Sequence, residues 1–398
     1  MQVVYTGDEM PESFTSSIFL AGPTPRNKEE VESWRPDALK LLEDMGYDGV
    51  VFVPEDKEKV FKKDYDDQIE WEEKYLNIAD CIVFWVPRDL TLDSKDFPKM
   101  AAFTTNVEWG HWYDSGKVVF GYPEGAEKVS YLEHYADKCN VPIGKTLTET
   151  LDHAMEMVGN GAERESGERY VPLFIWKTES FQSWYGAQKR AGNRLENARL
   201  LFNFRPRYKD FVFLWVLKAN VWVESEGRYK DNEVVLARTD ISSVLLWHKT
   251  LPLEFSKVII VKEFRSPANT EDGFVRELPG GSSPGKNTDH EETAAEEIQE
   301  ETGLYVDPSR IRFHEARQLA ATFSSHKAYL YSVELKDDEL EWFKSQEGIV
   351  HGNTKDTERT FIEIYTVKQL LQSNLVDWST LGMIWSAYYR AWNEDLYA

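Results

Sequence analysis

Three glutamates in the C-terminal half of the chain, Glu297, Glu300 and Glu301, have the spacing of a joint ligand set. Positions three and four residues apart share one face of a helix, so these carboxylates would converge if the segment is helical. Carboxylates so close together repel one another unless a cation neutralises them, and their hard oxygen atoms suit Mg²⁺ or Mn²⁺. A glycine turn at Gly280 and Gly281 opens into the predicted helix. The stretch therefore predicts a metal and diphosphate site.

The whole stretch from residue 277 to residue 304, ELPGGSSPGKNTDHEETAAEEIQEETGL, resembles the Nudix box, whose helix ends R-E-U-x-E-E-x-G-U with U apolar. The segments FRSPA (264–268) and ELPGG (277–281) are similar to the ADP-ribose-type branch of that family. The resemblance implies hydrolysis of a nucleoside diphosphate derivative that depends on Mg²⁺ or Mn²⁺. It assigns the metal to Glu297, Glu300 and Glu301, catalysis to Glu300 and Glu301, and substrate binding to Arg265, Gly280 and Gly281.

The resemblance to the Nudix box is incomplete. Glu296 stands where the box has arginine, one residue is inserted after the glycines, and Lys286 or Thr288 lies near the place of a spaced glutamate. The E-x-x-E-E core is intact, so metal binding is expected while turnover is left open. The alternative interpretation is an acidic, solvated amphipathic helix. A further catalytic carboxylate would come from one of three downstream residues, Asp356, Glu358 or Glu363.

In the N-terminal half, the segments SIFLAGPTPR, IEWEEKYLNIADCIVFWVPRD, TTNVEWGHW and SGKVVFGYP together resemble the nucleoside 2-deoxyribosyltransferase-like family. That family has a nucleophilic glutamate in an E-[LFW]-G context, and Glu108 occupies this place. Glu72, eight residues before Asp80, occupies the place of the acidic residue that holds and protonates the nucleobase. Cleavage of an N-glycosidic bond builds positive charge on the sugar, which one carboxylate can trap while a second carboxyl protonates the leaving base.

Other positions around this predicted site match the family's pattern less well. Phe19 aligns with a tyrosine that orients the nucleophile in the family, and a further acidic residue has only Asp89 and Asn106 as counterparts. The loop GPTPR follows the first predicted strand, and ligands of doubly wound sheets bind at the carboxyl ends of strands. Gly22 and Arg26 are therefore predicted to contact substrate, with an ordinary strand-to-helix turn as the alternative.

The elements that must position the N-terminal residues alternate along the chain. Apolar runs predict strands at 17–21, 50–53, 81–86 and 118–122. Helices are predicted at 29–45, 68–78, 100–115, 128–138 and 147–158. Strands that are apolar on both faces and separated by helices predict a doubly wound parallel sheet of flavodoxin-like, deoxyribosyltransferase-like type. The predicted domain covers residues 1–158, and the polar, glycine-rich segment after it opens a linker over 159–180.

Residues 181–398 are predicted to form a mixed α+β domain of Nudix type with an N-terminal helical extension. The extension is one long helix over 181–201. Strands are predicted at 211–223, 233–238, 243–247, 258–261, 329–334 and 361–365, and helices at 367–372 and 378–392. The acidic run 337–339 is interpreted as a solvated turn.

Composition limits the classes of partner. The formal net charge of −23 argues against a general nucleic-acid binder and against an anionic membrane surface. The two cysteines, Cys81 and Cys139, have no zinc-site spacing, and no apolar run is long enough to cross a bilayer. The N-terminus does not read as a signal peptide. These features predict a soluble, cytoplasmic protein whose partner is a small nucleotide or nucleoside, with a homo-oligomer expected.

Three functions remain open at this point. The first is a bifunctional enzyme of nucleotide metabolism, with one site for the diphosphate and one for the N-glycosidic bond. The second is a nucleotide-binding sensor in which one or both sites do not turn over. The third is a single active domain with the other as its structural partner.

Overall fold

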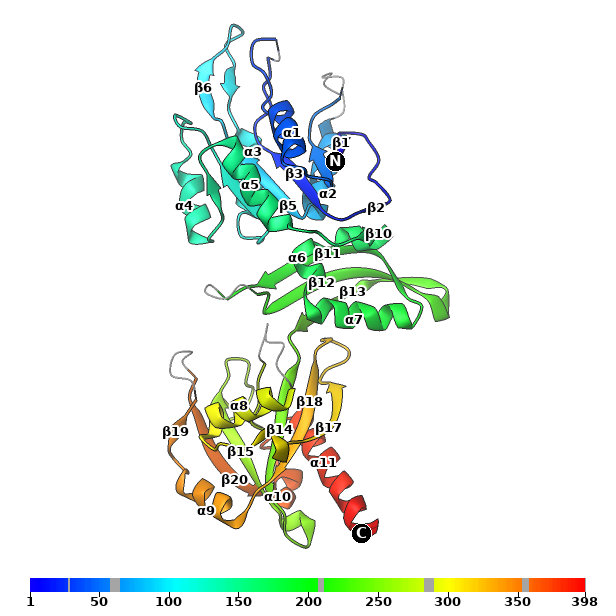
Figure 1. Ribbon diagram of the computed structural model, residues 1–398, viewed down its shortest axis with the longest axis vertical. Helices are drawn as coiled ribbons and strands as arrows, with labels where there is room; N and C mark the ends of the chain where they lie inside the picture. Colours follow the sequence, from blue (N-terminus) through cyan, green and yellow to red (C-terminus); the bar gives the residue numbers. More distant parts are fainter. Residues whose placement is uncertain (28, 58–64, 207–210, 283–289, 353–357, 398) are drawn as a thin grey trace. The chain divides into compact units, whose positions relative to one another are not determined.

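The computed structural model describes residues 1–27, 29–57, 65–206, 211–282, 290–352 and 358–397 (Figure 1). The chain forms two compact units. The first unit comprises residues 1–204 and 215–235, and the second comprises residues 205–214 and 236–398. This division differs from the predicted boundary after residue 158, because the residues that follow pack with the first unit.

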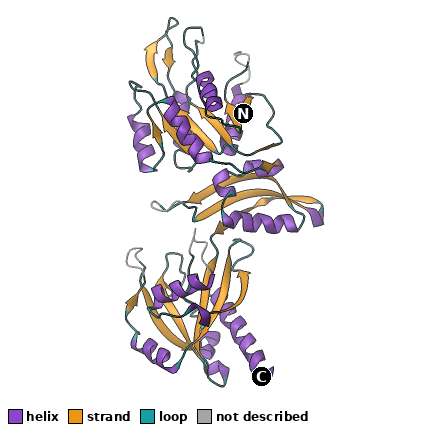
Figure 2. Cartoon of the chain, viewed as in Figure 1, coloured by secondary structure: helices purple, strands orange, loops and turns teal. Residues whose placement is uncertain are grey.

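A six-stranded parallel sheet forms the centre of the first unit (Figure 2). Its strands, in spatial order, are β1 (Gln2–Tyr5), β4 (Val50–Val53), β3 (Ser17–Ala21), β5 (Cys81–Trp85), β8 (Val118–Gly121) and β9 (Ile143–Gly144). Every residue of β3, β4, β5 and β8 is buried. Strands covered on both faces must be apolar throughout. The predicted parallel sheet is therefore confirmed.

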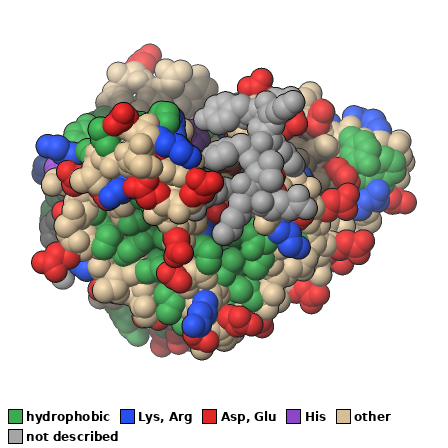
Figure 3. All heavy atoms as spheres, turned by 90° about the horizontal axis from the view of Figure 1, so that it is seen from above, with side chains coloured by type: hydrophobic (Ala, Val, Ile, Leu, Met, Phe, Trp, Pro, Cys, Tyr) green, Lys and Arg blue, Asp and Glu red, His purple; other side chains and the backbone are tan. Residues whose placement is uncertain are grey.

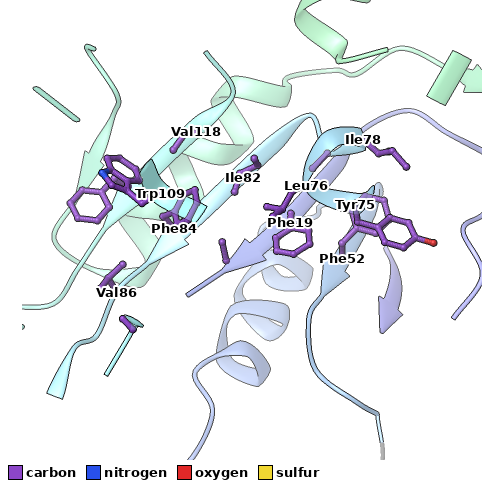
Figure 4. Packing of buried hydrophobic residues seen from close by; sticks show 14 of the residues in the cluster. Phe19, Phe52, Tyr75, Leu76, Ile78, Ile82, Phe84, Val86, Trp109 and Val118 are labelled. Atoms are coloured by element: carbon purple, nitrogen blue, oxygen red, sulfur yellow. The ribbon is translucent and has the colours of Figure 1, made fainter. Parts of the chain in front are cut away.

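Helices cover both faces of this sheet. One face packs against α2 (Tyr65–Ile78), α3 (Phe103–Trp112) and α4 (Ser130–Lys138), and the other against α1 (Arg35–Asp44) and α5 (Leu147–Val158). On the first face, Phe52 of β4 packs on Tyr75 at 4.6 Å between ring centroids, and Phe84 of β5 packs on Trp109 at 5.3 Å (Figure 4). Two short antiparallel pairs lie outside this sheet, β2 (Ser13–Phe14) with β10 (Arg164–Glu165) and β6 (Asp89–Leu92) with β7 (Pro98–Met100).

Two predicted helices begin clearly later in the structure than the sequence predicts. The helix predicted from residue 29 begins at Arg35, where a proline lies in its first turn. Proline loses no hydrogen bond in that turn and restricts the residue before it, so it favours a start there. The helix predicted from residue 100 begins at Phe103, because Met100 ends β7 and Ala102 has a φ of 56°.

The segment predicted as a linker, residues 159–180, is folded. It contains β10, the 3₁₀ turn η1 (Ser166–Tyr170) and α6 (Leu173–Trp176). The Arg164 and Asp80 side chains are both fully buried and form an ion pair. Asp80 also accepts a hydrogen bond from the backbone N–H of Leu173 at 2.9 Å. A buried carboxylate thus ties this segment to the parallel sheet.

The predicted long helix over 181–201 is wrong. The chain forms α7 (Glu179–Arg190), turns at Gly192 with a φ of 79°, and continues as β11 (Arg194–Phe204). This strand joins β12 (Leu214–Val223) and β13 (Arg228–Arg238) in a three-stranded sheet, with the 3₁₀ turn η2 (Glu224–Glu226) between the last two. Phe181 of α7 is fully buried and lies 5.8 Å from the Trp215 ring of β12. Packing across this sheet prevails over the helical propensity of residues 194–201.

A mixed sheet forms the centre of the second unit. Its path is β17 (Arg312–Gln318), β18 (Lys327–Glu334), β14 (Ile241–His248), β15 (Lys257–Phe264), β20 (Thr360–Thr366) and β19 (Val350–His351), and β16 (Phe274–Glu277) also pairs with β15. The β14–β18 pair is parallel and the other pairs are antiparallel.

Helices cover both faces of this second sheet as well. One core includes residues of α8 (His290–Thr302) and α9 (Asp337–Ser345), and the other includes residues of α10 (Val367–Gln372) and α11 (Trp378–Tyr397). Short 3₁₀ turns lie at η3 (Leu253–Phe255) and η4 (Pro308–Arg310). The acidic residues 337–339, predicted as a turn, form the first turn of α9, where negative charge favours the helix N-terminus.

Acidic side chains are spread over the face of the molecule seen in Figure 3, with lysines and arginines among them. This distribution accompanies the formal net charge of −23. Among the described residues, no helix has both the length and the apolar character that crossing a bilayer requires.

Candidate functional site

The two carboxylates predicted in the N-terminal half, Glu72 of α2 and Glu108 of α3, lie near each other and are half-buried. Burial raises the pKa of Glu108 to about 8, and the charge of Glu72 raises it further while Arg35 opposes the shift. Burial also raises the pKa of Glu72, against a hydrogen bond from Gln68 Nε2 at 2.9 Å. The raised pKa of Glu108 favours its protonated form near neutral pH.

Arg35 is the functional candidate that sequence reasoning missed. Its side chain is almost fully buried, with 1% of its surface exposed. It donates hydrogen bonds to Leu20 O at 3.0 Å and to Gly22 O at 2.8 Å, and it forms an ion pair with Glu55 at 2.5 Å. A single arginine at the start of a helix is not part of any recognisable sequence motif. Only the fold brings its charge close enough to stabilise the ionised forms of both glutamates.

Gly22 and Arg26 of the GPTPR loop have different surroundings. A Cβ added to Gly22 would lie 2.2 Å from Trp85 O and 2.9 Å from Trp34 Cζ2, so glycine is required by packing within the protein. Arg26 is exposed, with its guanidinium 5.9 Å from the centre of the Phe97 ring. The structure therefore gives Gly22 a packing role and leaves substrate contact at Arg26 as a prediction.

Asp89 and Asn106 also have local partners. Asp89 Oδ1 accepts hydrogen bonds from Thr91 N at 2.9 Å and Thr91 Oγ1 at 2.6 Å, which makes it a turn residue at the start of β6. Asn106 Oδ1 accepts a hydrogen bond from Arg88 Nη2 at 2.5 Å. Phe19, at the position of the family's tyrosine, is fully buried and 6.1 Å from the Trp71 ring.

A second acidic group lies in the C-terminal unit. Carboxylate oxygens of Glu263, Glu301 and Glu358 all lie within 4.8 Å of one another. Glu301 is 5% exposed, and its Oε2 accepts a hydrogen bond from Gly280 N at 2.8 Å. Burial raises the pKa of Glu301 well above its usual range against that hydrogen bond, and the charges of Glu297, Glu277 and Glu358 raise it further. Burial raises the pKa of Glu263 to about 7.

This carboxylate group differs from the predicted ligand set. Glu301 belongs to both, and Glu358 was one of the candidates for a downstream carboxylate. Glu297 lies beside the group, because a Cβ on Gly281 would be 2.5 Å from Glu297 Oε2. Glu300 is exposed, and the structure does not place it in the three-carboxylate group. On α8, the side chains of Glu297 and Glu301 point inward while the side chain of Glu300 points to solvent, so the three carboxylates do not converge on one spot.

Glu263 was not predicted, although the sequence carried a signal. It lies in the apolar run KVIIVKEF of β15, at a buried position. A glutamate facing inward in such a strand requires a partner.

Four further positions complete the account of the residues named for the Nudix resemblance. Glu363 pairs with Arg276 at 2.8 Å. Asp356, Lys286 and Thr288 lie outside the described residues.

Arg265 supplies positive charge next to this group. Its Nη2 is 2.8 Å from Glu263 Oε2 and 3.4 Å from Glu277 Oε1. Glu263 Oε2 is nevertheless buried without a hydrogen-bond partner among the described residues. The carboxylates thus outnumber the cation beside them, and an all-oxygen donor set with surplus negative charge fits Mg²⁺ or Mn²⁺.

Comparison with known families bears on the first unit. The family model described as "Nucleoside 2-deoxyribosyltransferase like" matches residues 15–126, which include Arg35, Glu72 and Glu108. The chain therefore has an N-terminal nucleoside 2-deoxyribosyltransferase-like domain. The match does not extend into the second unit, where the Nudix resemblance stays a prediction. No curated protein matches the chain.

Proposed function

We propose that the protein is a bifunctional enzyme of nucleotide metabolism. The first unit breaks or transfers an N-glycosidic bond, and the second hydrolyses a nucleoside diphosphate derivative in the manner of Nudix enzymes. The observation that carries the proposal is the approach of Glu72 and Glu108 inside the region matched by the nucleoside family.

The roles in the first unit follow from the coupled carboxyls. Burial and the charge of Glu72 keep Glu108 protonated near neutral pH in the free chain. On substrate binding, Glu108 passes this proton to Glu72 and, as a carboxylate, attacks or stabilises the anomeric carbon, while Glu72 gives the proton to the leaving base. Arg35, held by backbone carbonyls, favours the ionised form of the pair and is a positioning residue.

The second unit offers Glu263, Glu301 and Glu358 as metal ligands and Arg265 as a phosphate partner. The chemistry that Mg²⁺ or Mn²⁺ supplies when bound is neutralisation of pyrophosphate charge and activation of a water. The backbone N–H of Gly280 holds the Glu301 carboxylate in place. Glu297, beside Gly281, is the proposed acceptor of a proton from the attacking water.

Turnover assays on the full chain test both halves. The chain is incubated with Mg²⁺ and a panel of nucleosides, nucleotides and NAD derivatives, and free base and phosphate esters are measured. We expect Glu108→Gln to lower base release by about 100-fold or more, because general acid–base and nucleophilic groups contribute at that level. Glu70→Gln, an exposed change on α2, is the control. Equal loss in both variants would refute the role of Glu108.

For the diphosphate reaction, Glu301→Gln and Glu300→Gln form a matched pair on α8. We expect loss of phosphate-ester release in the first and little change in the second, because only Glu301 lies in the buried carboxylate group. The reverse order would favour the ligand set first predicted from the helix spacing.

A nucleotide sensor is the second candidate. It is favoured by Phe19, which puts a buried ring where the family's tyrosine hydroxyl would be, and by Glu296 in place of the Nudix arginine. Tight binding of a nucleotide with no product from any compound would support the sensor. Activity lost in only one of the two sites' variants would support a single active domain.

A further inference from the structure

A pocket of about 470 Å³ lies between α3 and α4 in the first unit. Its lining includes Arg88, Asn106, Trp109, Tyr113, Tyr131 and Tyr135. Glu108 interacts with Glu72 of α2, whereas the pocket is lined by residues of α4. The pocket and the acidic pair therefore flank the same helix, α3, and neither glutamate lines the pocket. A volume of this size is within the range that holds small molecules.

Arg88 is the unusual residue of this pocket. Only 6% of its surface is exposed, yet among the described residues it has no carboxylate partner. Nη1 donates to Lys128 O at 2.7 Å, and Nη2 donates to Asn106 Oδ1 at 2.5 Å. Its Nε is buried without a hydrogen-bond partner in the described part of the chain. Burying a charge without a counter-ion is costly, so an anion that pairs with it would be favoured.

Trp109 is the second lining residue whose hydrogen-bond donor has no partner among the described residues. Its Nε1 is buried and lacks a hydrogen-bond partner among the described residues. Two lining residues thus carry donors that are unpartnered in the described part of the chain, Arg88 Nε and Trp109 Nε1, and both of these atoms are buried from solvent. The described lining contains no aspartate or glutamate, although the chain as a whole is strongly acidic. These features select a ligand that brings acceptors and negative charge.

Aromatic rings form the rest of the wall. The ring centroids of Tyr113 and Tyr135 are 5.0 Å apart, and those of Tyr131 and Tyr135 are 5.2 Å apart. Tyr131 is 72% exposed at the rim, so its ring is open to a partner. Aromatic side chains around an arginine are suited to a planar ring that carries an anionic group.

From this arrangement we infer that the pocket between α3 and α4 binds a small aromatic anion, a planar ring with one phosphate or carboxylate group, separately from the Glu72–Glu108 site. The anionic group pairs with Arg88, and the ring stacks against Tyr113, Tyr131 and Tyr135. This inference does not require that either proposed reaction takes place.

Isothermal titration calorimetry on the full chain tests the inference. The probes are adenosine 5′-monophosphate, 1-naphthoate and uncharged adenosine. We expect one or both anions to bind and adenosine to bind at least about tenfold more weakly, since a charge-assisted contact is worth more than about 1.4 kcal/mol. Binding of adenosine monophosphate alone would assign the pocket to nucleotides, and binding of naphthoate would assign it to aromatic anions in general. Failure of both anions to bind would overturn the inference.

Variants locate the bound anion. Tyr131→Ala, at an exposed rim position that is safe for folding, should weaken binding about fivefold or more through lost stacking. Arg88→Gln should weaken it at least tenfold, and if this buried change prevents folding, Tyr131→Ala decides alone. Tyr305→Ala, an exposed tyrosine of the second unit, is the matched control.

Glu108→Gln separates this inference from the proposed function. The variant should retain anion binding, because Glu108 does not line the pocket. Binding that is lost in Glu108→Gln and unchanged in Tyr131→Ala would place the anion at the acidic pair and overturn the inference. Binding that follows Tyr131 in a chain without turnover would support it even if the proposed reactions fail.

Discussion

Glu108 is a half-buried glutamate that keeps its proton at a pH where an exposed glutamate is ionised. Its pKa is raised to about 8 from the ordinary 4.5, first by burial and then by the charge of Glu72. Between those two pH values the folded chain holds a proton that the unfolded chain releases. The free energy of unfolding therefore falls as pH rises through this range. A raised carboxyl pKa of this kind is typical of sites that perform acid–base catalysis.

Glu108→Gln should make stability less dependent on pH. At pH 4 the carboxyl is protonated in both states and the substitution changes little. As pH rises from 4.5 to 8 the wild-type chain loses stability relative to the variant, and the difference stays constant above pH 8. Melting temperatures between pH 5 and pH 9 measure this, with Glu70→Gln as control. Parallel pH profiles for the wild-type chain and Glu108→Gln would contradict the coupling.

Two adjacent glycines allow a matched test at the carboxylate group. A Cβ on Gly280 would lie 2.0 Å from Ser242 O, a backbone atom that cannot move alone. A Cβ on Gly281 would meet the Glu297 carboxylate at 2.5 Å, the end of a flexible side chain. We therefore expect Gly280→Ala to cost about 1–3 kcal/mol in unfolding free energy. Gly281→Ala should leave stability nearly unchanged and lower the release of phosphate esters in the turnover assay, because it displaces Glu297, the proposed proton acceptor. Similar stability losses in both variants would refute this distinction.

At the scale of elements, the folded segment after α5 depends on one buried ion pair. Arg164 and Asp80 are both fully buried, and Arg164 Nη1 also donates to Val171 O at 2.8 Å. Without the arginine, the carboxylate of Asp80 would stay buried with backbone and serine donors only. The ion pair thus joins β10 and α6 to strands β3 and β5.

Arg164→Met should destabilise the first unit by about 3–5 kcal/mol, because it leaves a buried charge without its partner. Arg228→Met is the control, since the Arg228–Glu226 pair is exposed and such pairs contribute about 0–1 kcal/mol. Urea unfolding followed by tryptophan fluorescence compares the two. Equal midpoints for both variants would show that the Arg164–Asp80 pair does not hold the segment.

At the scale of the whole molecule, the first compact unit extends well beyond the region matched by the nucleoside family. The match covers residues 15–126, whereas the unit includes residues up to 204 and a return through β12 and β13. The three-stranded sheet and α7 therefore belong to the physical domain that carries Glu72 and Glu108.

A chain that ends after residue 158 should fail to unfold cooperatively, because it lacks the Arg164 partner of Asp80. A chain that ends after residue 238 keeps β10, α6, α7 and the three-stranded sheet, and it should melt in one cooperative transition. Circular dichroism melts of both fragments measure this. A cooperative melt of the shorter fragment would show that the segment 159–180 is dispensable.

The sequence by itself determined the parallel sheet and the family of the first unit. Runs such as VVFV and CIVFW are apolar at every position, which only a strand covered on both faces requires. The E-W-G context selected Glu108 and the spacing to Asp80 selected Glu72 as candidates, and their catalytic roles stay predictions. The identity of residues 194–204 as a strand was not accessible, since their local pattern is helical and Phe181–Trp215 packing decides the outcome.

Only the tertiary structure decided which charges share a site. Arg35 is far from Glu108 in the sequence, and Glu263 is far from Glu301 and Glu358, yet folding brings each set together. Side-chain spacing along a helix predicts which residues share a face. It does not predict which residues of other strands and loops face them, because that depends on how the chain closes on itself.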